Sequence, residues 1–180
     1  MKQMFALLLA VMATSPVAAE ATRVTPGEEV EIMKQMTQLA SKFNAGDYTY
    51  SVSLAPPSVF TISGIDKQKV AEQAEQLMTK IKASGFTFKV KNLEKIIAAY
   101  TCKSTKLVFI QTHSEIENSA TKVVSATYMI ASRDNGSGAW YFADGTGMPS
   151  RTVFDQIYGC NGVTLTLPHI KNETIAKKKP

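Results

Sequence analysis

The sequence has few of the residues from which metal and redox sites are built. Its 180 residues include only two histidines and two cysteines. His113 and His169 have no ligand spacing to either cysteine, whereas a zinc site needs such ligands clustered. A redox CxxC motif is missing as well. We therefore expect neither a metal nor a cofactor.

A long hydrophobic run is also missing. The apolar stretch from Phe5 to Ala13 is far shorter than the roughly 20 residues that span a bilayer. It follows a lysine and precedes a run of small residues, which is the layout of a secretory signal. We expect residues 1–19 to be removed by cleavage before Glu20, although cleavage after Ala21 also fits. The mature chain is then periplasmic or secreted and has no transmembrane segment.

The folded part of the chain has no excess charge of one sign. Residues 20–170 contain fifteen Lys and Arg against fourteen Asp and Glu, and the remaining basic excess lies in the lysines from Lys171 onward. Nucleic-acid binding requires a basic stripe on the fold itself, so we expect no nucleic-acid partner. We assign residues 20–160 to a single domain and residues 161–180 to a C-terminal extension with a basic, solvated tail.

Cys102 and Cys160 are the two cysteines of the chain. An exported protein meets an oxidising compartment, where a cysteine pair commonly forms a disulfide. The alternative, a metal site, lacks the clustered ligands described above. We therefore predict a disulfide between Cys102 and Cys160.

Helical periodicity dominates the first half of the chain. A helix is expected to begin at Pro26 with acidic residues in its first turn and to end at residues 44–47. A short second helix reaches Leu54, and residues 58–62 are expected to be extended after two prolines. Asp66 is expected to cap a third helix that ends at Gly85.

Apolar and polar residues then alternate in the manner of β-strands. The alternation recurs at residues 86–90, 96–101, 106–116 and 122–132, and residues 134–138 form a strong hairpin turn before a strand at 139–143. A short helix around Phe154 and an extended segment at residues 163–167 follow. The pattern predicts an α+β fold in which N-terminal helices pack on a curved antiparallel β-meander.

Three segments carry a resemblance to a known family: FNAGDY at the end of the first helix, LAPPSVFTISG after it, and SRDNGSGAWYFADG in the hairpin. With the order of elements, they make residues 28–145 resemble the nuclear transport factor two-like superfamily, whose cone-shaped, cystatin-like fold is shared by SnoaL and ketosteroid isomerase. The chain looks like an exported bacterial member. This resemblance implies the fold far more strongly than any activity.

The isomerase branch of that family implies a carboxylate base, a tyrosine and a protonated acid. In this sequence the matching positions fall near Ile62, Leu39 and Ile130, and none of these is an acid or a tyrosine. A different catalytic reading would use His113 with Asp144 or Glu115. Because His113 lies within a strand pattern and no triad accompanies it, a non-catalytic protein is favoured.

Apolar residues on both faces of the meander lead to two non-catalytic hypotheses. One sheet face must pack on the helices; the other lines a pocket, covers a dimer partner or is shielded by the C-terminal extension. The leading hypothesis is a binding protein of the bacterial envelope, or a homodimer, that uses Tyr128, Trp140 and Phe142 on the outer sheet face. The alternative is a binder or carrier of a small apolar ligand inside the cone. The residues expected to line its pocket are Met36, Leu39, Phe43, Phe60, Phe109, Gln111 and His113.

Overall fold

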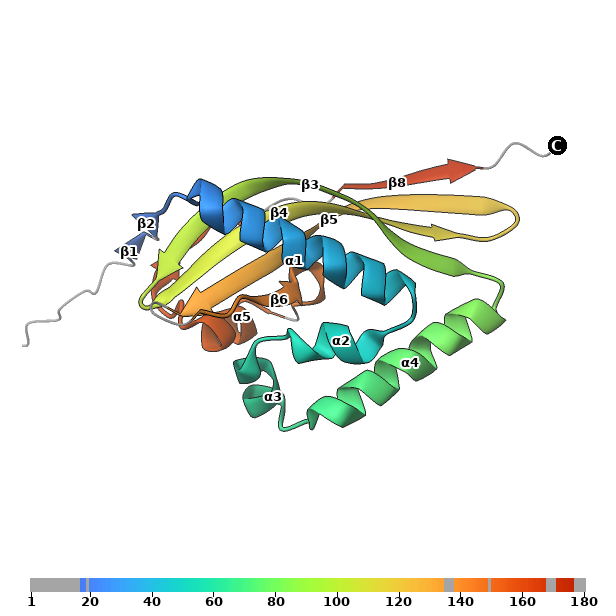
Figure 1. The fold of residues 1–180 in the computed structure, drawn as a ribbon, viewed down its shortest axis with the longest axis horizontal. Coiled ribbons are helices and arrows are strands. Elements are labelled where there is room, and N and C mark those ends of the chain that lie inside the picture. Colours follow the sequence, from blue (N-terminus) through green and yellow to red (C-terminus); the bar gives the residue numbers. More distant parts are fainter. Residues whose placement is uncertain (1–16, 19, 135–137, 149, 168–170, 177–180) are drawn as a thin grey trace, which may run out of the picture.

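The computed structural model of the chain describes residues 17–18, 20–134, 138–148, 150–167 and 171–176 (Figure 1). Four helices precede the long strands: α1 (Pro26–Asn44), α2 (Tyr48–Ser53), α3 (Pro57–Ser63) and α4 (Lys67–Ala83). Most of the predicted signal peptide, 1–16 and 19, lies outside the described residues.

The main sheet is curled and antiparallel, and all of its strands except β2 (Glu20–Ala21) follow these helices. Its long strands are β3 (Thr87–Cys102), β4 (Thr105–Glu117) and β5 (Thr121–Asp134). The sheet order is β2-β3-β4-β5-β6, where β6 is Tyr141–Asp144. The predicted α+β class is confirmed, and the half-barrel curl is compatible with a cone-like fold.

Helix α1 begins with a capping box. The Thr25 hydroxyl accepts a hydrogen bond from the Glu28 N–H, and the Glu28 carboxylate accepts one from the Thr25 N–H at 2.8 Å. The buried side chains of the helix, Ile32 and Met36, face the sheet. Asp47 caps α2 by accepting from the Tyr50 N–H, so the predicted break between these helices is confirmed.

Helix α3 corrects the prediction that residues 58–62 are extended. Pro57 occupies the first turn, where its missing N–H has no intrahelical partner to lose. Gly64 then closes the helix in the left-handed region, at φ 65°. The prolines therefore start a helix here. The third predicted helix is confirmed as α4, which Asp66 caps.

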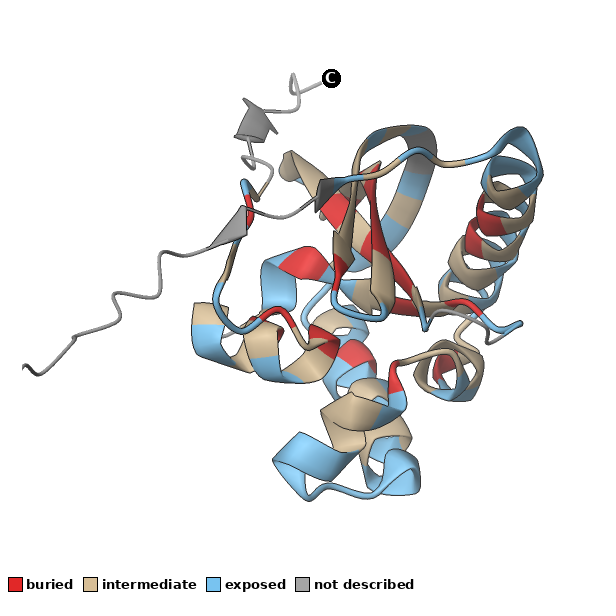
Figure 2. Cartoon of the chain, turned by 90° about the vertical axis from the view of Figure 1, so that its left-hand side faces the viewer, coloured by how far each residue is buried: buried red, intermediate tan, exposed pale blue. Residues whose placement is uncertain are grey.

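Two hydrophobic cores lie on opposite faces of the sheet. The inner core joins α1 to one face and contains Ile32, Met36, Val108, Ile110, Ala131, Trp140 and Phe142. The outer core joins the other face to α5 (Arg151–Tyr158) and contains Leu107, Phe109, Tyr128, Ile130, Phe154, Tyr158 and Leu165. Buried residues accordingly colour the sheet and the sheet-facing side of α1 in Figure 2. The outer face is thus shielded mainly by α5, which lies within the predicted domain, and to a smaller extent by Leu165 of the predicted C-terminal extension.

This shielding corrects the placement of the three predicted surface anchors. Tyr128, Trp140 and Phe142 are only 5%, 2% and 3% exposed. Tyr128 belongs to the outer core, whereas the other two belong to the inner core. They therefore do not form one exposed surface.

The predicted disulfide between Cys102 and Cys160 is confirmed, with a Cα–Cα distance of 5.0 Å. Both cysteines belong to the outer core and are 0% exposed. The bond joins the end of β3 to the residue after the left-handed C-cap of α5. It therefore fastens α5 to the outer sheet face.

The C-terminal extension is more ordered than the sequence indicated. Strand β8 (Lys171–Ala176) pairs with residues 121–126 of β5, and β6 pairs with residues 129–132 of the same strand. The predicted extended segment at 163–167 contributes the short β7 (Val163–Thr164), which pairs with β1 (Val17–Ala18). Residues 177–180 and the predicted hairpin turn at 135–137 lie outside the described residues.

Gly145, directly after β6, leaves no room for a side chain. A Cβ atom there would lie 1.9 Å from a ring carbon of Tyr128. We expect Gly145→Ala to lower the free energy of unfolding by about 2 kcal/mol, because it overpacks a buried site. Urea unfolding measures this effect. Gly147→Ala is the matched control, because a Cβ there meets no atom within 4 Å. Equal midpoints for the two variants would contradict the expectation.

Candidate functional site

A large cavity lies between the inner sheet face and the helices. Its volume is about 880 Å³, near the upper end of the roughly 300–1,000 Å³ typical of ligand pockets. Every helix and the strands β3 to β6 contribute to its wall. Most of the lining is apolar: Met36, Leu39, Ala40, Phe43, Val52, Ala55, Val59, Ile62, Val70, Phe88, Val90, Met129, Phe142, Ala143, Met148, Val153 and Ile157.

The helical walls of the cavity are held by local contacts. Phe43 meets Tyr48 and Phe88 edge to face, with ring centroids 5.1 and 5.6 Å apart, so α1, α2 and β3 are joined at one end. At the other end the Ser58 hydroxyl of α3 donates to the Ile157 carbonyl of α5 at 3.0 Å. These contacts join the helices to β3 in one part of the cavity wall and to α5 in another.

Four hydroxyl residues lie on the sheet floor of this mostly apolar cavity. Thr112 faces Thr127 across β4 and β5, and Ser114 faces Ser125 one step further along the same face. The hydroxyls of Thr112 and Thr127 are hydrogen bonded at 2.7 Å. We call these four residues the hydroxyl floor. Along β4 and β5 they follow the apolar residues of the inner core on the same sheet face. This face therefore changes from apolar to hydroxyl side chains where the cavity begins.

The structure brings together only part of the predicted pocket set. Met36, Leu39, Phe43 and His113 line the cavity. Of these four, His113 differs in the direction of its side chain. It lies between Thr112 and Ser114 in β4, so strand alternation directs its side chain to the sheet face opposite theirs.

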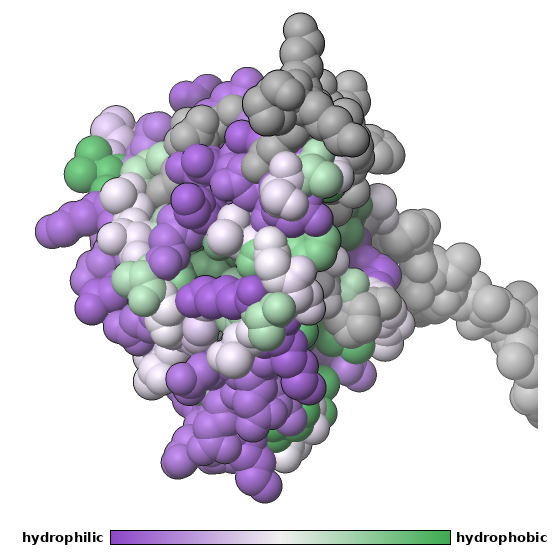
Figure 3. All heavy atoms as spheres, turned by 90° about the vertical axis from the view of Figure 1, so that its right-hand side faces the viewer, coloured by the Kyte–Doolittle hydropathy of each residue, from purple (hydrophilic) through white to green (hydrophobic). Residues whose placement is uncertain are grey.

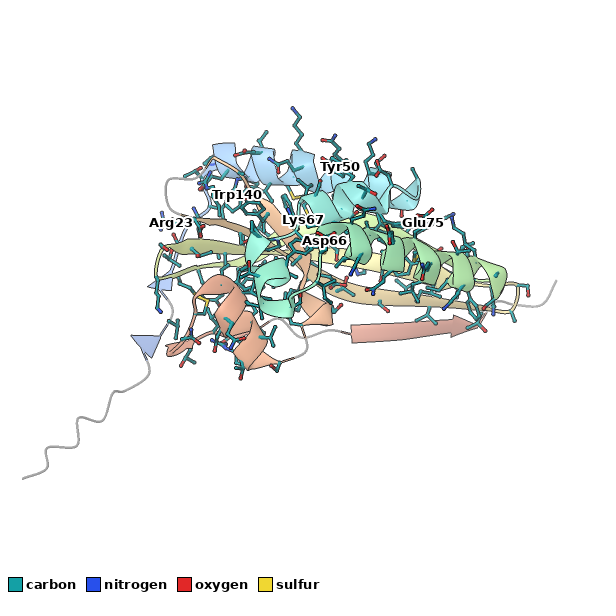
Figure 4. All side chains as sticks on the ribbon, turned by 90° about the horizontal axis from the view of Figure 1, so that it is seen from below. Arg23, Tyr50, Asp66, Lys67, Glu75 and Trp140 are labelled. Atoms are coloured by element: carbon teal, nitrogen blue, oxygen red, sulfur yellow. A yellow bond between two sulfur atoms is a disulfide. The ribbon has the colours of Figure 1, made fainter. Side chains whose placement is uncertain are left out.

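The other three predicted residues lie elsewhere. Phe109 is fully buried in the outer core, and Gln111 shares its strand face. Phe60 is not among the lining residues, because its ring packs under the Lys67 ammonium, 5.0 Å from the ring centroid. Figure 4 shows Lys67 next to Asp66 at the start of α4. The physical reason is that α3 is helical, so Val59 and Ile62 turn toward the cavity in place of Phe60.

Charged groups are scarce around the cavity. Among the described lining residues there is no Lys or Arg, and Asp144 is the carboxylate. Its Oδ1 accepts hydrogen bonds from the N–H and the hydroxyl of Thr146, which fixes the turn at the cavity edge. Burial and, to a smaller extent, the charge of Asp144 raise the pKa of Tyr128 on the other sheet face.

The positions at which the family resemblance implies a carboxylate base, a tyrosine and a protonated acid can now be located. Ile62 and Ser63 lie in the cavity wall on α3, and Leu39 lies in the wall on α1. Ile130 is buried in the outer core, on the opposite side of the sheet. Two of the three positions therefore lie in the cavity wall, where the side chains are apolar or hydroxyl groups, and the third does not.

Sequence reasoning missed most of the lining, including the hydroxyl floor. A signal was present: Val108 and Ile110 are followed by Thr112 and Ser114 at the same spacing in one strand. The corresponding positions of β5 change from Ser and Thr to Met and Ala. A matched change from apolar to hydroxyl side chains in paired strands indicates a cavity face.

None of the helices in the described part of the chain is long and apolar enough to cross a membrane. Comparison with protein-family models, with curated proteins and with solved structures found no match to this chain. Function must therefore be inferred from the cavity itself.

Proposed function

We propose that this protein is a non-catalytic binder or carrier of a small apolar molecule, which occupies the cavity between the sheet and the helices. The observation that carries this proposal is the cavity of about 880 Å³ with a predominantly apolar lining. A well-formed apolar pocket with a few convergent polar groups is typical of small-molecule sites. The structure thus favours the second of the two sequence hypotheses.

The distribution of apolar residues on the surface supports the ligand-binding hypothesis over the hypothesis of a docking surface. The large apolar side chains that are exposed lie on α1, on α3 and the loop after it, on α4, on β3 and on β4: Val30, Ile62, Ile65, Leu77, Ile97 and Ile116. On the face shown in Figure 3, hydrophobic residues form only small, separate patches among hydrophilic ones. Isolated exposed apolar residues are normal, whereas a docking surface is contiguous.

The disulfide and the predicted signal peptide together support a location outside the cytoplasm. Disulfides persist in oxidising compartments, and the described chain contains one with both sulfurs buried. We therefore place the protein in the periplasm or among secreted proteins. Its curled half-barrel and helices are compatible with an exported bacterial member of the nuclear transport factor two-like superfamily.

Probe binding with a matched pair of variants tests this function. We expect the fluorescent apolar probe phenylnaphthylamine to bind the wild-type protein with enhanced emission. Ala40→Phe places a ring into the cavity from α1 and should weaken binding at least about tenfold by occupying ligand volume. Ala83→Phe adds the same ring at an exposed position of α4 and should leave binding unchanged.

Native mass spectrometry of the gently purified protein provides a second readout. An added noncovalent mass of small-molecule size that is lost in Ala40→Phe would support the proposal. Failure of the wild-type protein to bind the probe would contradict the proposal. Equal binding of the probe by Ala40→Phe and Ala83→Phe would contradict it as well.

A further inference from the structure

The hydroxyl floor has more hydrogen-bonding capacity than the protein uses. Thr112 and Thr127 share one hydrogen bond, in which one hydroxyl donates to the other. The second O–H of this pair therefore remains available as a donor. Within the described part of the chain, neither the Ser114 nor the Ser125 hydroxyl has a protein hydrogen-bond partner.

The position of these groups directs their capacity into the cavity. The β4–β5 register is continuous through both pairs, so the four side chains share the sheet face that carries Ile110 and Met129. Thr112 is only 3% exposed, whereas Thr127, Ser114 and Ser125 are partly exposed. A hydroxyl left unpaired in an apolar surrounding is costly, so a ligand gains affinity by supplying a partner.

The charges around the cavity restrict what that partner can be. A buried carboxylate or phosphate needs a cation or several N–H donors, and the described lining offers neither Lys nor Arg. Asp144 adds a negative charge on β6, opposite Met129 in the sheet register. An anionic head group would therefore be desolvated without compensation and repelled.

From this arrangement we infer that the ligand is a neutral amphiphile: an apolar body that ends in a hydroxyl, carbonyl or similar uncharged polar group. Its apolar body contacts the helical wall, and its polar end lies on the hydroxyl floor. This inference rests on the proposed function, and it adds the chemical class of the ligand and the residues that select it.

A series of decyl compounds tests the inference, because only the head group varies. Decanol, decanoate and decylamine would each be used to displace phenylnaphthylamine from the protein at neutral pH. We expect decanol to bind at least about tenfold more tightly than decanoate, whose charge has no partner in the cavity. Decylamine should also bind more weakly than decanol, because its ammonium loses its hydration in the cavity while Asp144 is exposed at the cavity edge and already accepts two hydrogen bonds from Thr146.

Removal of the floor hydroxyls should weaken the binding of decanol. Thr112→Val with Thr127→Val replaces both partners of one hydrogen bond by groups of the same shape, a change that is nearly neutral for stability. We expect the affinity for decanol to fall at least about fivefold in this double variant, because its hydroxyl group loses its hydrogen-bonding partners on the floor. Thr37→Val is the control. Thr37 is an exposed residue of α1, and its hydroxyl donates to the Met33 carbonyl of the same helix. Ser114→Ala with Ser125→Ala provides a second floor variant if the first unfolds.

The possible failures are distinguishable. If the probe binds but decanoate or decylamine competes as well as decanol, the inferred ligand class is wrong while the proposed function stands. Retention of the wild-type affinity for decanol in both floor variants would equally overturn the role of the hydroxyl floor. If neither the probe nor any decyl compound binds the wild-type protein, the proposed function fails, and the inference fails with it.

Discussion

Removal of the Cys102–Cys160 disulfide is expected to lower the free energy of unfolding by about 4 kcal/mol, because the bond closes a loop of 58 residues in the unfolded chain. Such a loss approaches the whole stability of many domains of this size. The effect should also be structural, since the bond fastens α5 to the outer core. We therefore expect the outer core, with Phe154 and Tyr158, to open first when the bond is absent.

Unfolding in urea with and without a reductant measures this prediction. The midpoint of the wild-type protein should fall when the reductant is present. The double variant Cys102→Ala, Cys160→Ala should unfold at the lower midpoint in both conditions, which controls for any effect of the reductant itself. A wild-type midpoint that does not respond to complete reduction would show that the disulfide contributes little to stability.

Local signals determined how much of the fold could be predicted. Capping residues and periodicity located α1, α2, α4 and α5, because the residues that begin and end these helices lie in the helices or directly beside them in the sequence. Helix α3 was missed because a proline forbids a helix before it but favours one after it, and only packing decides which effect prevails. Strand β8 pairs with a distant strand, which no local pattern reveals.

The candidate site was harder to predict than the fold. Strand alternation assigns Phe109 and Thr112 to opposite faces, but it does not say which face is filled by a core and which borders a cavity. That outcome depends on how far the helices stand from the sheet. Here α5 fills the outer face, while α1 to α3 leave a space over part of the inner face. The predicted pocket set therefore mixed residues from both faces.

The ion cluster around Glu28 combines a local signal with distant partners. The sequence showed Glu28 in the first turn of a helix, where its charge is favourable. The structure adds Lys106 at 2.8 Å and Arg133, which lie on β4 and β5. The guanidinium of Arg133 also stacks 4.4 Å from the ring centroid of Trp140, whose indole N–H donates to Glu31. The start of α1 is thus anchored to the sheet by charge as well as by the inner core.

Acidification is expected to destabilise the protein through this cluster. Burial alone would raise the pKa of Glu28, but hydrogen bonds from Lys106 and Thr25 outweigh it and lower the pKa from 4.5 to about 2. A lowered folded-state pKa gives stability that is complete above the unfolded value and is lost as the pH falls through the folded value. Between pH 4.5 and about 2 we therefore expect a loss of up to about 3 kcal/mol from Glu28.

Glu28→Gln separates this charge effect from helix capping, because glutamine at the same position can still complete the capping box. At neutral pH the variant should be less stable by about 3 kcal/mol, since Lys106 and Arg133 lose a carboxylate that is only 13% exposed. Glu29→Gln removes a charge from the same helical turn at an exposed residue and should change stability by less than about 1 kcal/mol.

The decisive comparison is the slope of unfolding free energy against pH, measured by urea titrations of the three proteins. The wild-type protein and Glu29→Gln should lose stability in parallel as the pH falls below 4.5, whereas Glu28→Gln should lose about 3 kcal/mol less over the same range. Its curve should therefore converge on that of the wild-type protein near pH 2. Parallel curves for all three proteins would show that Glu28 is not the group whose protonation weakens the fold, and that the anchoring of α1 depends on apolar packing alone.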